Sequence, residues 1–525
     1  SKKLSTSLRE LRHLKYLDLS GNDFRENRIP EFIGSLNQLT YLNLSNSYFS
    51  GIIPYHIGNL SHLKILDLGS YYSNDLMSHD ISWISGLSSL AYLDLSQVNL
   101  TGAKIFDVWF YMAPSLKVLK LSNCGLLIDD RGPLRNFSTT LSNIKHLDLN
   151  RNIFTDKIPR FFQNMTSLQF LDLSYPHGAA LNFSSSFLKL LSMSSSLFEL
   201  HLSGCNLKET PLSHVLHNLT TLSNIHHLNL HFNQLTGPIP ESVSKLKLLQ
   251  VLALSGNHLT GHIPESIGRL AALTTLYLGD NKLSGTIPVS IGQLSKLRLL
   301  DVYNNSLEGV VYESHFANLS MLEYLYAASN SKLTFNVSRE WLPPFQLIEI
   351  ELSSCKIENG FPQWLQNQRK LQVLELSNAT VSGPLPMWLR KMPIIPFIDL
   401  SHNNLSGPLT NLPRWESGFY SDGVGALFLQ NNLFNESIPR LHNNNFTGEI
   451  PRSLCKNLEL QVLDVAHNSF TGTIPRCLGE LQGMIDKPTY DDFAEGVEEG
   501  LIEKQWRHKL FMFAEETMDK IHVAI

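Results

Sequence analysis

The chain has 525 residues, of which 43% are hydrophobic and 17% are charged, and its net charge is −5. Residues 486–525 carry ten acidic and five basic side chains, so residues 1–485 are neutral overall. No basic tract is present, and this argues against a nucleic-acid partner, which would need clustered lysine and arginine. No apolar run of 18 residues occurs, so we expect no membrane segment in this chain.

A period of 24 residues is clearest between residues 246 and 309. Each copy has leucines in the pattern LxxLxLxxN, and both the leucines and the asparagines keep the step, as in Leu252, Leu276, Leu300, Asn257, Asn281 and Asn305. This period and pattern are typical of a leucine-rich repeat. Because such a chain grows by stacking coils on one continuous core, its length does not imply several domains.

Taken in chain order, the first leucine or isoleucine of each LxL marks one coil. The markers are residues 17, 42, 66, 93, 119, 147, 171, 200, 228, 252, 276, 300, 325, 350, 374, 398, 427 and 463, with one defective coil at about 429–441. We therefore predict a solenoid of 18–19 coils over residues 1–485. Each LxL should be a strand of one long parallel sheet, with both leucines buried and the residue between them facing outward.

Two further elements recur in many coils. Three positions after the second leucine stands an asparagine, which we expect to hydrogen-bond backbone groups of its own coil and the next. The phrase LxGxIP follows in many coils, as in residues 259–264, and its Ile-Pro is expected to open a second sheet on the flank.

The repeat is interrupted at several places. Residues 71–83 and 415–425 are longer than an ordinary turn, and such loops are either recognition elements or neutral insertions. Between Leu429 and Leu441 the marker advances by only half a period, which indicates lost sequence or distorted coils. Residues 486–525 have no repeat; their apolar spacing is that of a helix, which we interpret as an end cap, with a partner-binding helix as the alternative.

The five cysteines divide into two groups. Cys124, Cys205 and Cys355 replace the repeated asparagine in coils that are not neighbours, so they are expected to be buried free thiols. Cys455 and Cys477 follow the Ile-Pro of adjacent coils and are 22 residues apart. A disulfide between them is the prediction, and two separate thiols are the alternative.

Fourteen N-x-[ST] sequons favour a secreted or luminal chain. Some arise from the repeat itself, and Asn43 and Asn304 lie on or beside strands. The glycosylation candidates are Asn59, Asn99, Asn136, Asn164, Asn182, Asn218, Asn318, Asn336, Asn378 and Asn404.

No motif of a hydrolase, a kinase or a nucleotide-binding enzyme is present, and no cofactor is implied. Aspartates recur between the strand leucines, but the repeat consensus explains them without catalysis. Five histidines, at 146, 201, 226, 227 and 231, fall in four successive coils. A metal site or a pH-sensitive contact is one interpretation, and ordinary polar exposure is the alternative. We therefore expect the protein not to be an enzyme and not to bind a metal ion.

The predicted concave face mixes aromatic and acidic residues, a combination that suits binding of a peptide or protein and equally suits the repeat consensus. The ligand-binding candidates on this face are Tyr92, Asp94, Asp148, Phe170, Asp172, His201, His227, Tyr277, Asp301, Tyr303, Tyr324, Tyr326, Glu351 and Glu375.

Particular phrases resemble a known family. LxxLxLSxNxLxGxIPxxIGxLxxL at 249–273 resembles the plant-specific class of leucine-rich repeats, a superhelix with short 3-10 or helical segments on its convex side and a partial second sheet. KYLDLSGNDF (15–24), IGNLSHLKILDL (57–68) and IPRSLCKNLELQVLDVAHNSFTGTIPRCLG (450–479) resemble the ectodomains of plant receptor-like proteins, most of all the receptors of fungal ethylene-inducing xylanase.

The resemblance implies an immune or developmental receptor of the plasma membrane that lacks a kinase. Such proteins bind an apoplastic protein or peptide and signal through a partner receptor kinase, as co-receptor or adaptor. The family's signal peptide, N-terminal cysteine cap, last repeats and membrane helix are missing, so we expect a fragment. The alternatives are a secreted inhibitor of microbial cell-wall hydrolases, which is usually much shorter, and a truncated gene product.

Overall fold

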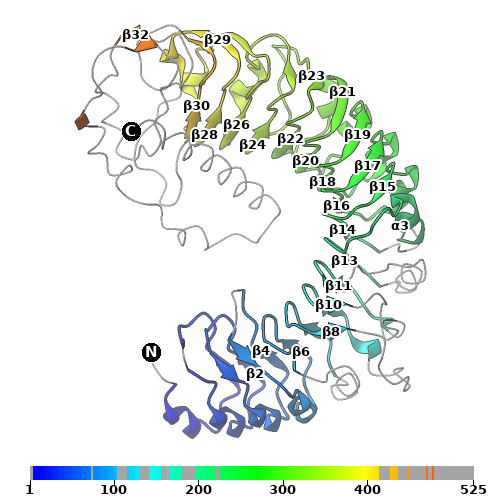
Figure 1. The fold of residues 1–525 in the computed structure, drawn as a ribbon, viewed down its shortest axis with the longest axis vertical. Coiled ribbons are helices and arrows are strands. Elements are labelled where there is room, and N and C mark those ends of the chain that lie inside the picture. Colours follow the sequence, from blue (N-terminus) through cyan, green and yellow to red (C-terminus); the bar gives the residue numbers. More distant parts are fainter. Residues whose placement is uncertain are drawn as a thin grey trace.

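The chain forms a curved solenoid in which parallel strands line the inner side and helical turns line the outer side (Figure 1). The computed structural model describes residues 4–25, 27–71, 75–102, 115–128, 141–154, 162, 165–178, 196–219, 222, 224–412, 426–434, 447–448, 469–470 and 476–477. The predicted coils centred on residues 441 and 463, the loop 415–425 and the segment 486–525 lie outside this part of the chain.

One parallel sheet of seventeen strands runs through the described coils. Each strand is centred on a predicted marker, so these positions are confirmed. The strands are β1 (Tyr16–Asp18), β2 (Tyr41–Asn43), β4 (Ile65–Asp67), β6 (Tyr92–Asp94), β7 (Val118–Lys120), β9 (His146–Asp148), β11 (Phe170–Asp172), β13 (Glu199–His201), β14 (His227–Asn229), β16 (Val251–Ala253), β18 (Thr275–Tyr277), β20 (Leu299–Asp301), β22 (Tyr324–Tyr326), β24 (Glu349–Glu351), β26 (Val373–Glu375), β28 (Phe397–Asp399) and β30 (Ala426–Phe428).

The register of this sheet places each leucine beside its counterpart in the next coil. Leu252 of β16 pairs with Leu228 of β14 on one side and with Leu276 of β18 on the other. These leucines are fully buried, and the core continues through the whole length of the described solenoid. Burial of one apolar column thus fixes the register, because a slip by one residue would turn every leucine outward.

In the described part of the chain, the outer side carries short 3-10 helices and one α-helix. They are η1 (Thr6–Glu10), η2 (Glu31–Ser35), η3 (Tyr55–Asn59), η4 (Ser82–Gly86), η5 (Leu141–Asn143), α3 (Leu212–Leu219), η7 (Glu241–Lys245), η8 (Glu265–Arg269), η9 (Val289–Gln293), η10 (Glu313–Phe316), η11 (Gln363–Asn367), η12 (Leu389–Lys391) and η13 (Leu409–Asn411).

Glycine allows these helical turns to pack closely. A Cβ atom on Gly268 of η8 would lie 2.3 Å from the backbone oxygen of Ser290 in η9. The repeated glycine of the phrase IG is therefore a spacing requirement between coils.

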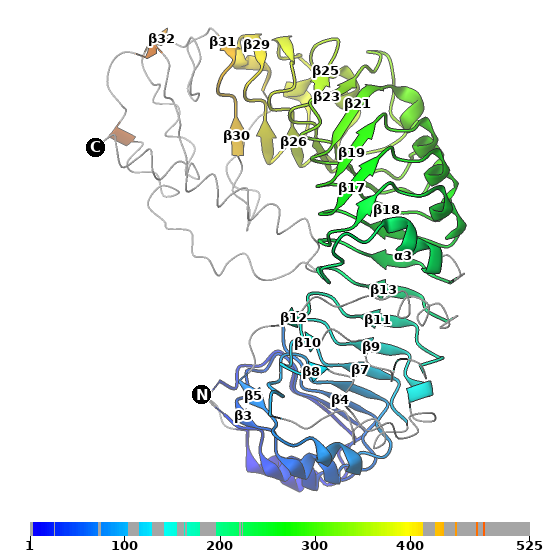
Figure 2. The same cartoon turned by 45° about the vertical axis from the view of Figure 1, so that its right-hand side comes forward.

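Smaller parallel sheets lie on one flank, where Figure 2 shows β17, β19, β21 and β23 side by side. Their strands are β3 (Gly51–Ile52), β5 (Leu76–Met77), β8 (Leu127–Ile128), β10 (Ile153–Phe154), β12 (His177–Gly178), β15 (Thr236–Gly237), β17 (His258–Gly261), β19 (Lys282–Gly285), β21 (Ser306–Val311), β23 (Lys332–Phe335), β25 (Lys356–Ile357), β27 (Ser382–Pro384), β29 (Asn404–Gly407), β31 (Leu433–Phe434), β32 (Thr447–Gly448) and β33 (Ser469–Phe470).

The predicted second sheet is present, but its position in the coil differs from the prediction. Strand β17 ends at Gly261, before Ile263-Pro264, and Pro264 is the N-cap of η8. Proline cannot donate a ladder hydrogen bond, and here it begins the helical turn, so the Ile-Pro pair follows the flank strand. Part of the long segment 71–83 belongs to the regular structure of the solenoid. Its strand β5 pairs with β3, and its Trp83 lies buried in η4.

The repeated asparagine joins each coil to the one before it, not to the next as the sequence suggested. Asn257 donates from Nδ2 to the carbonyl oxygens of Leu230 (3.0 Å) and Leu254 (2.9 Å). Its Oδ1 accepts the N–H of Leu235 at 3.1 Å. The amide therefore lies beneath the turn of the preceding coil and forms hydrogen bonds with buried backbone groups of both coils.

The three cysteines at this position are buried free thiols, as predicted. Cys355 keeps the donor half of the asparagine's role, since its Sγ donates to the oxygen of Ala327 at 3.1 Å. The thiol does not replace the amide oxygen, which in other coils accepts a backbone N–H from the preceding coil. In the coil before Cys355 that N–H belongs to Leu333, and it donates to the backbone oxygen of Asn330. A coil can thus lose the acceptor if its neighbour closes the turn locally.

The hydrogen bonds of the repeated asparagine predict that two substitutions at one site lower the free energy of unfolding by different amounts. Asn257→Ala leaves the buried Leu235 N–H unpaired and removes one of the two hydrogen bonds to the Leu230 oxygen, which keeps its bond from Asn233. The free energy of unfolding should therefore fall by about 2 kcal/mol. Asn257→Cys keeps a donor toward Leu230, so its loss of unfolding free energy should be smaller than that of Asn257→Ala by about 1 kcal/mol. Urea unfolding of both variants measures the difference; equal losses would contradict the role given to the thiol.

Candidate functional site

The concave face of the large sheet holds the predicted ligand-binding residues. Its side chains form three columns: the first precedes the first strand leucine (Tyr16 in β1), the second lies between the leucines (Asp18), and the third follows the second leucine (Ser20). Thirteen candidates occupy the first two columns, and Tyr303 occupies the third, after β20. The spacing of about 4.8 Å between strands brings neighbours in a column into contact.

Nine of these candidates are half-buried and reach solvent: Tyr92, Asp148, Phe170, Asp172, His201, His227, Tyr277, Tyr303 and Tyr324. The expectation of an exposed side chain is wrong for the other five, which are buried: Asp94, Asp301, Tyr326, Glu351 and Glu375. Neighbouring coils cover them; Asp301, for example, accepts from the Ser255 hydroxyl at 3.3 Å, two coils away.

Aspartate in the second column has a structural role that repeats along the sheet. Its Oδ1 accepts the N–H two residues later, as in Asp94 with Ser96 (2.9 Å) and Asp172 with Ser174 (2.8 Å). This bond satisfies a backbone donor where the strand ends and the turn begins. The recurrence of aspartate is thus explained by the turn, as the repeat-consensus interpretation held.

Neighbouring carboxylates nevertheless disturb one another. Burial raises the pKa of Asp67 to about 6, with the charge of Asp94 adding to the effect. Burial also raises the pKa of Asp148 to about 7, with a further contribution from Asp172. Lys120 lies 3.8 Å from Asp94, but within the described residues no cation lies within 4 Å of Asp148.

Tyrosine and glutamate interact in the later coils. The hydroxyl of Tyr326 donates to Glu349 Oε2 at 2.5 Å, and burial raises the pKa of both groups. Tyr324 lies beside them, with its ring centroid 6.3 Å from that of Tyr326. Glu349 was absent from the predicted set, although its place in the first column could have been read from the LxL frame.

Of the five predicted histidines, His201 and His227 are brought together, on β13 and β14. Glu199, which the sequence reasoning missed, lies between His201 and His227, and their hydrogen bonds hold the pKa of its carboxyl well below the usual range. His231 is buried, which lowers its pKa to about 4, and its Nε2 has no hydrogen-bond partner. Among the described residues no group of histidine, cysteine and acidic side chains is arranged to hold a metal ion.

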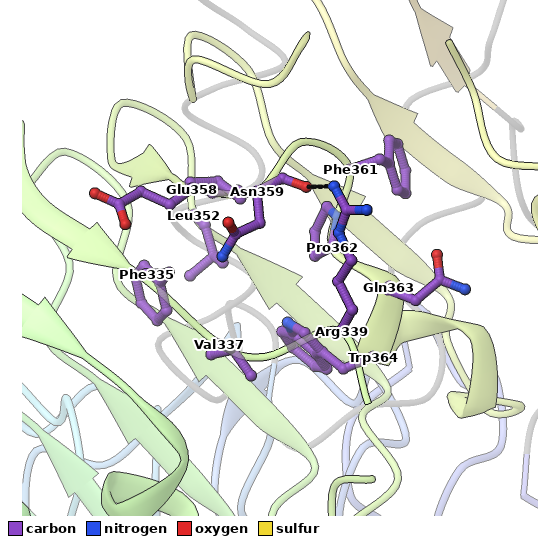
Figure 3. Close-up of a pocket in the computed structure, with 11 residues that line it drawn as sticks. Phe335, Val337, Arg339, Leu352, Glu358, Asn359, Phe361, Pro362, Gln363 and Trp364 are labelled. Atoms are coloured by element: carbon purple, nitrogen blue, oxygen red, sulfur yellow. Dashed lines mark hydrogen bonds between the residues drawn. The ribbon is translucent and has the colours of Figure 1, made fainter. Parts of the chain in front are cut away.

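A pocket lies away from the concave candidates, between the ends of β23 and β25 and the start of η11 (Figure 3). Phe335, Val337, Phe361 and Trp364 supply apolar lining. Arg339 crosses it and donates to the oxygen of Asn359 at 3.2 Å. The guanidinium thus ties the loops of two coils together, and none of the predicted site residues lines this pocket.

The sequons and the predicted disulfide are only partly within the described residues. Six candidate asparagines have exposed side chains: Asn59, Asn99, Asn318, Asn336, Asn378 and Asn404. Asn136, Asn164 and Asn182 lie outside the described residues, as does the side chain of Asn218. Cys477 is disulfide-bonded, whereas its predicted partner Cys455 lies outside the described part. In that part no helix is long and apolar enough to cross a membrane.

Known sequences share the repeat architecture. The family described as a leucine-rich repeat region matches residues 179–415, and single leucine-rich repeats match 13–36, 38–60, 143–165 and 459–481. The solved structure of the Arabidopsis receptor kinase HAESA, in complex with the peptide hormone IDA and the co-receptor SERK1, is similar with a TM-score of 0.63 and 25% identity. The match covers 85% of this chain and 81% of that one. The fold is that of a plant receptor ectodomain.

Two curated relatives from Solanum lycopersicum narrow the class. Receptor-like protein EIX1 is 39% identical over 447 residues, and receptor-like protein EIX2 is 43% identical over 439 residues. Each match covers 71% of this chain and 42% of the relative, so the chain spans less than half the length of these relatives. The chain belongs to the leucine-rich-repeat receptor-like proteins of plants.

The raised pKa of Asp148 predicts a pH-dependent gain on its replacement. Because the folded pKa of about 7 exceeds the unfolded value of about 3.9, the folded chain loses stability as pH rises from about 4 to about 7. Asp148→Asn removes this pH-dependent loss. The difference in unfolding free energy between the variant and the unsubstituted chain should therefore grow in favour of the variant as pH rises from about 4 to about 7.

Asp18→Asn is the matched control, because Asp18 holds the same column position but is exposed. The hydroxyl and N–H of Ser20 lower the pKa of Asp18, so the control should show no gain at high pH. Urea unfolding at about pH 4 and about pH 8 distinguishes them. If Asp148→Asn behaves as the control does, the raised pKa assigned to Asp148 is wrong.

Proposed function

We propose that this chain forms the ligand-recognition part of the extracellular region of a kinase-lacking receptor-like protein of the plasma membrane. The ligand is an apoplastic peptide or protein, and the signal, immune or developmental, passes through a partner receptor kinase. The observation that carries the proposal is the long concave sheet, whose half-buried aromatic and acidic side chains stand on a rigid frame.

Two considerations support this assignment. Aromatic side chains that are already held in place lose little conformational entropy on binding, which favours recognition by such a surface. HAESA, which has the same fold, is described with a peptide hormone and a co-receptor bound. The exposed sequons fit an extracellular chain, and we propose Asn59, Asn99, Asn318, Asn336, Asn378 and Asn404 as glycan carriers.

A glycan placed on the concave face tests the proposal. Val251→Asn with Ala253→Ser creates a sequon on β16 at the middle of the face, and peptides selected from a phage-displayed random library should no longer bind. Because a glycan is bulky and hydrated, it excludes ligands from the surface around it. Binding to the chain, secreted from plant cells behind a leader peptide, is measured by surface plasmon resonance.

The control places a glycan on the outer side of the same coil. Lys245→Asn with Lys247→Thr reproduces the NL[ST] phrase that the chain carries at residues 59–61, at the exposed end of η7. Peptide binding should survive this change. If both glycans abolish binding, or neither does, the concave face is not the recognition surface.

A further inference from the structure

One carboxylate lies between two imidazoles on β13 and β14. Glu199 Oε2 is 3.3 Å from His201 Nε2 and 3.5 Å from His227 Nδ1. All three side chains are partly exposed, by 26%, 24% and 31%, so the cluster is open to solvent on the concave face. Its charge therefore changes with pH at a place a ligand can reach.

Two aromatic stacks flank this cluster. On the β11 side Phe170 stacks on His146, with centroids 3.9 Å apart, and its ring is 5.2 Å from His201. On the other side Phe198, which is 38% exposed, stacks on His226 at 4.0 Å. The charged centre thus has an apolar ring on each side.

The surrounding charges favour an anion at this point in acidic solution. His227 pairs with Glu199, which raises the pKa of the imidazole, and a protonated His201 then adds one net positive charge. His226 and Lys145 add to it from the strand edges, whereas Asp172 of β11 opposes it.

The remaining neighbours contribute little charge in acidic solution. On β9, burial lowers the pKa of His146 to about 4, so that imidazole is neutral, and the raised pKa of Asp148 leaves it mostly protonated. Lys120 of β7 is paired with Asp94. Strand β16, on the other side, contributes only Val251 and Ala253. In several other coils, among them those of Asp18, Asp172 and Asp399, the second column carries a carboxylate, which repels an anion.

We propose that the cluster of Glu199, His201 and His227 is a subsite for one acidic side chain of the ligand, next to an apolar residue that packs on Phe170 or Phe198. A protonated imidazole has two N–H donors, and Glu199 accepts from one of them on His201, which leaves the other for the ligand carboxylate. His227 neutralises Glu199. The inference rests on the proposed function, because it assumes a peptide on the concave face.

The subsite predicts opposite effects for two substitutions in contact with each other. His201→Gln replaces a charged imidazolium donor by a neutral amide, so a selected acidic peptide should bind about tenfold more weakly, the change in Kd expected when one hydrogen bond loses its charge. Glu199→Gln removes the competing carboxylate, so the same peptide should bind at least as tightly. Loss of folding would weaken binding in both variants, and thus the pair separates charge from structure.

The experiment selects phage-displayed random peptides on the full chain at about pH 5.5, and measures the selected peptides again at about pH 7.5. An acidic residue next to an apolar one should be enriched, and binding should weaken at the higher pH as the imidazoles lose their protons. His258→Gln, an exposed histidine on flank strand β17, is the control and should change nothing.

Three results would overturn the inference: peptides without an acidic preference, equal binding of an Asp→Asn version of a selected peptide, or no effect of His201→Gln. In each of them the peptides still bind, so the proposed function stands. Failure to enrich any peptide on the unsubstituted chain would remove both proposals, and the two failures are therefore distinguishable.

Discussion

The hydrogen bonds of the repeated asparagine are the constraint on which the solenoid depends. Leucine burial drives the coils together, but apolar contact has no direction and would tolerate small rotations between coils. The amide of Asn281 does not tolerate such rotations, because its hydrogen bonds have fixed directions. It donates to Leu254 of the preceding coil and to Leu278 in its own turn, and it accepts from the N–H of Leu259. Each coil is therefore held at one rotation relative to its neighbour, and the columns of the concave face follow from that.

This rigid spacing explains the electrostatics of the concave face. A carboxylate in the second column cannot move away from its neighbour in the next coil, because its Oδ1 is already fixed by the turn N–H. Where two aspartates adjoin, as Asp148 and Asp172 do, Asp148 is left partly buried, and among the described residues no cation lies within 4 Å of it. The proposed recognition surface is thereby made from residues that also have a structural role.

The sequence was sufficient for the coils and insufficient for the side chains between them. Leucine spacing predicted all seventeen described strand positions, because burial of the LxL leucines depends only on local alternation. It misplaced the second sheet at Ile-Pro, whose proline instead begins the helix at Pro264. The burial of Asp301 and the part played by Glu199 depend on contacts between coils, and no single coil contains that information.

Beside the histidine cluster, two bulky residues at the turn after the strand are each matched by a glycine in the next coil. Tyr175 and Phe232 have positive φ angles of 51° and 50°, which are costly for bulky residues. The next coil has glycine at the same position in each case: a Cβ on Gly204 would lie 2.5 Å from the ring of Tyr175, and one on Gly256 equally close to that of Phe232. Each ring thus lies across the glycine of its neighbour. The rim beside the cluster is specified across two coils at a time, so a change in one coil alters the surface presented by the next.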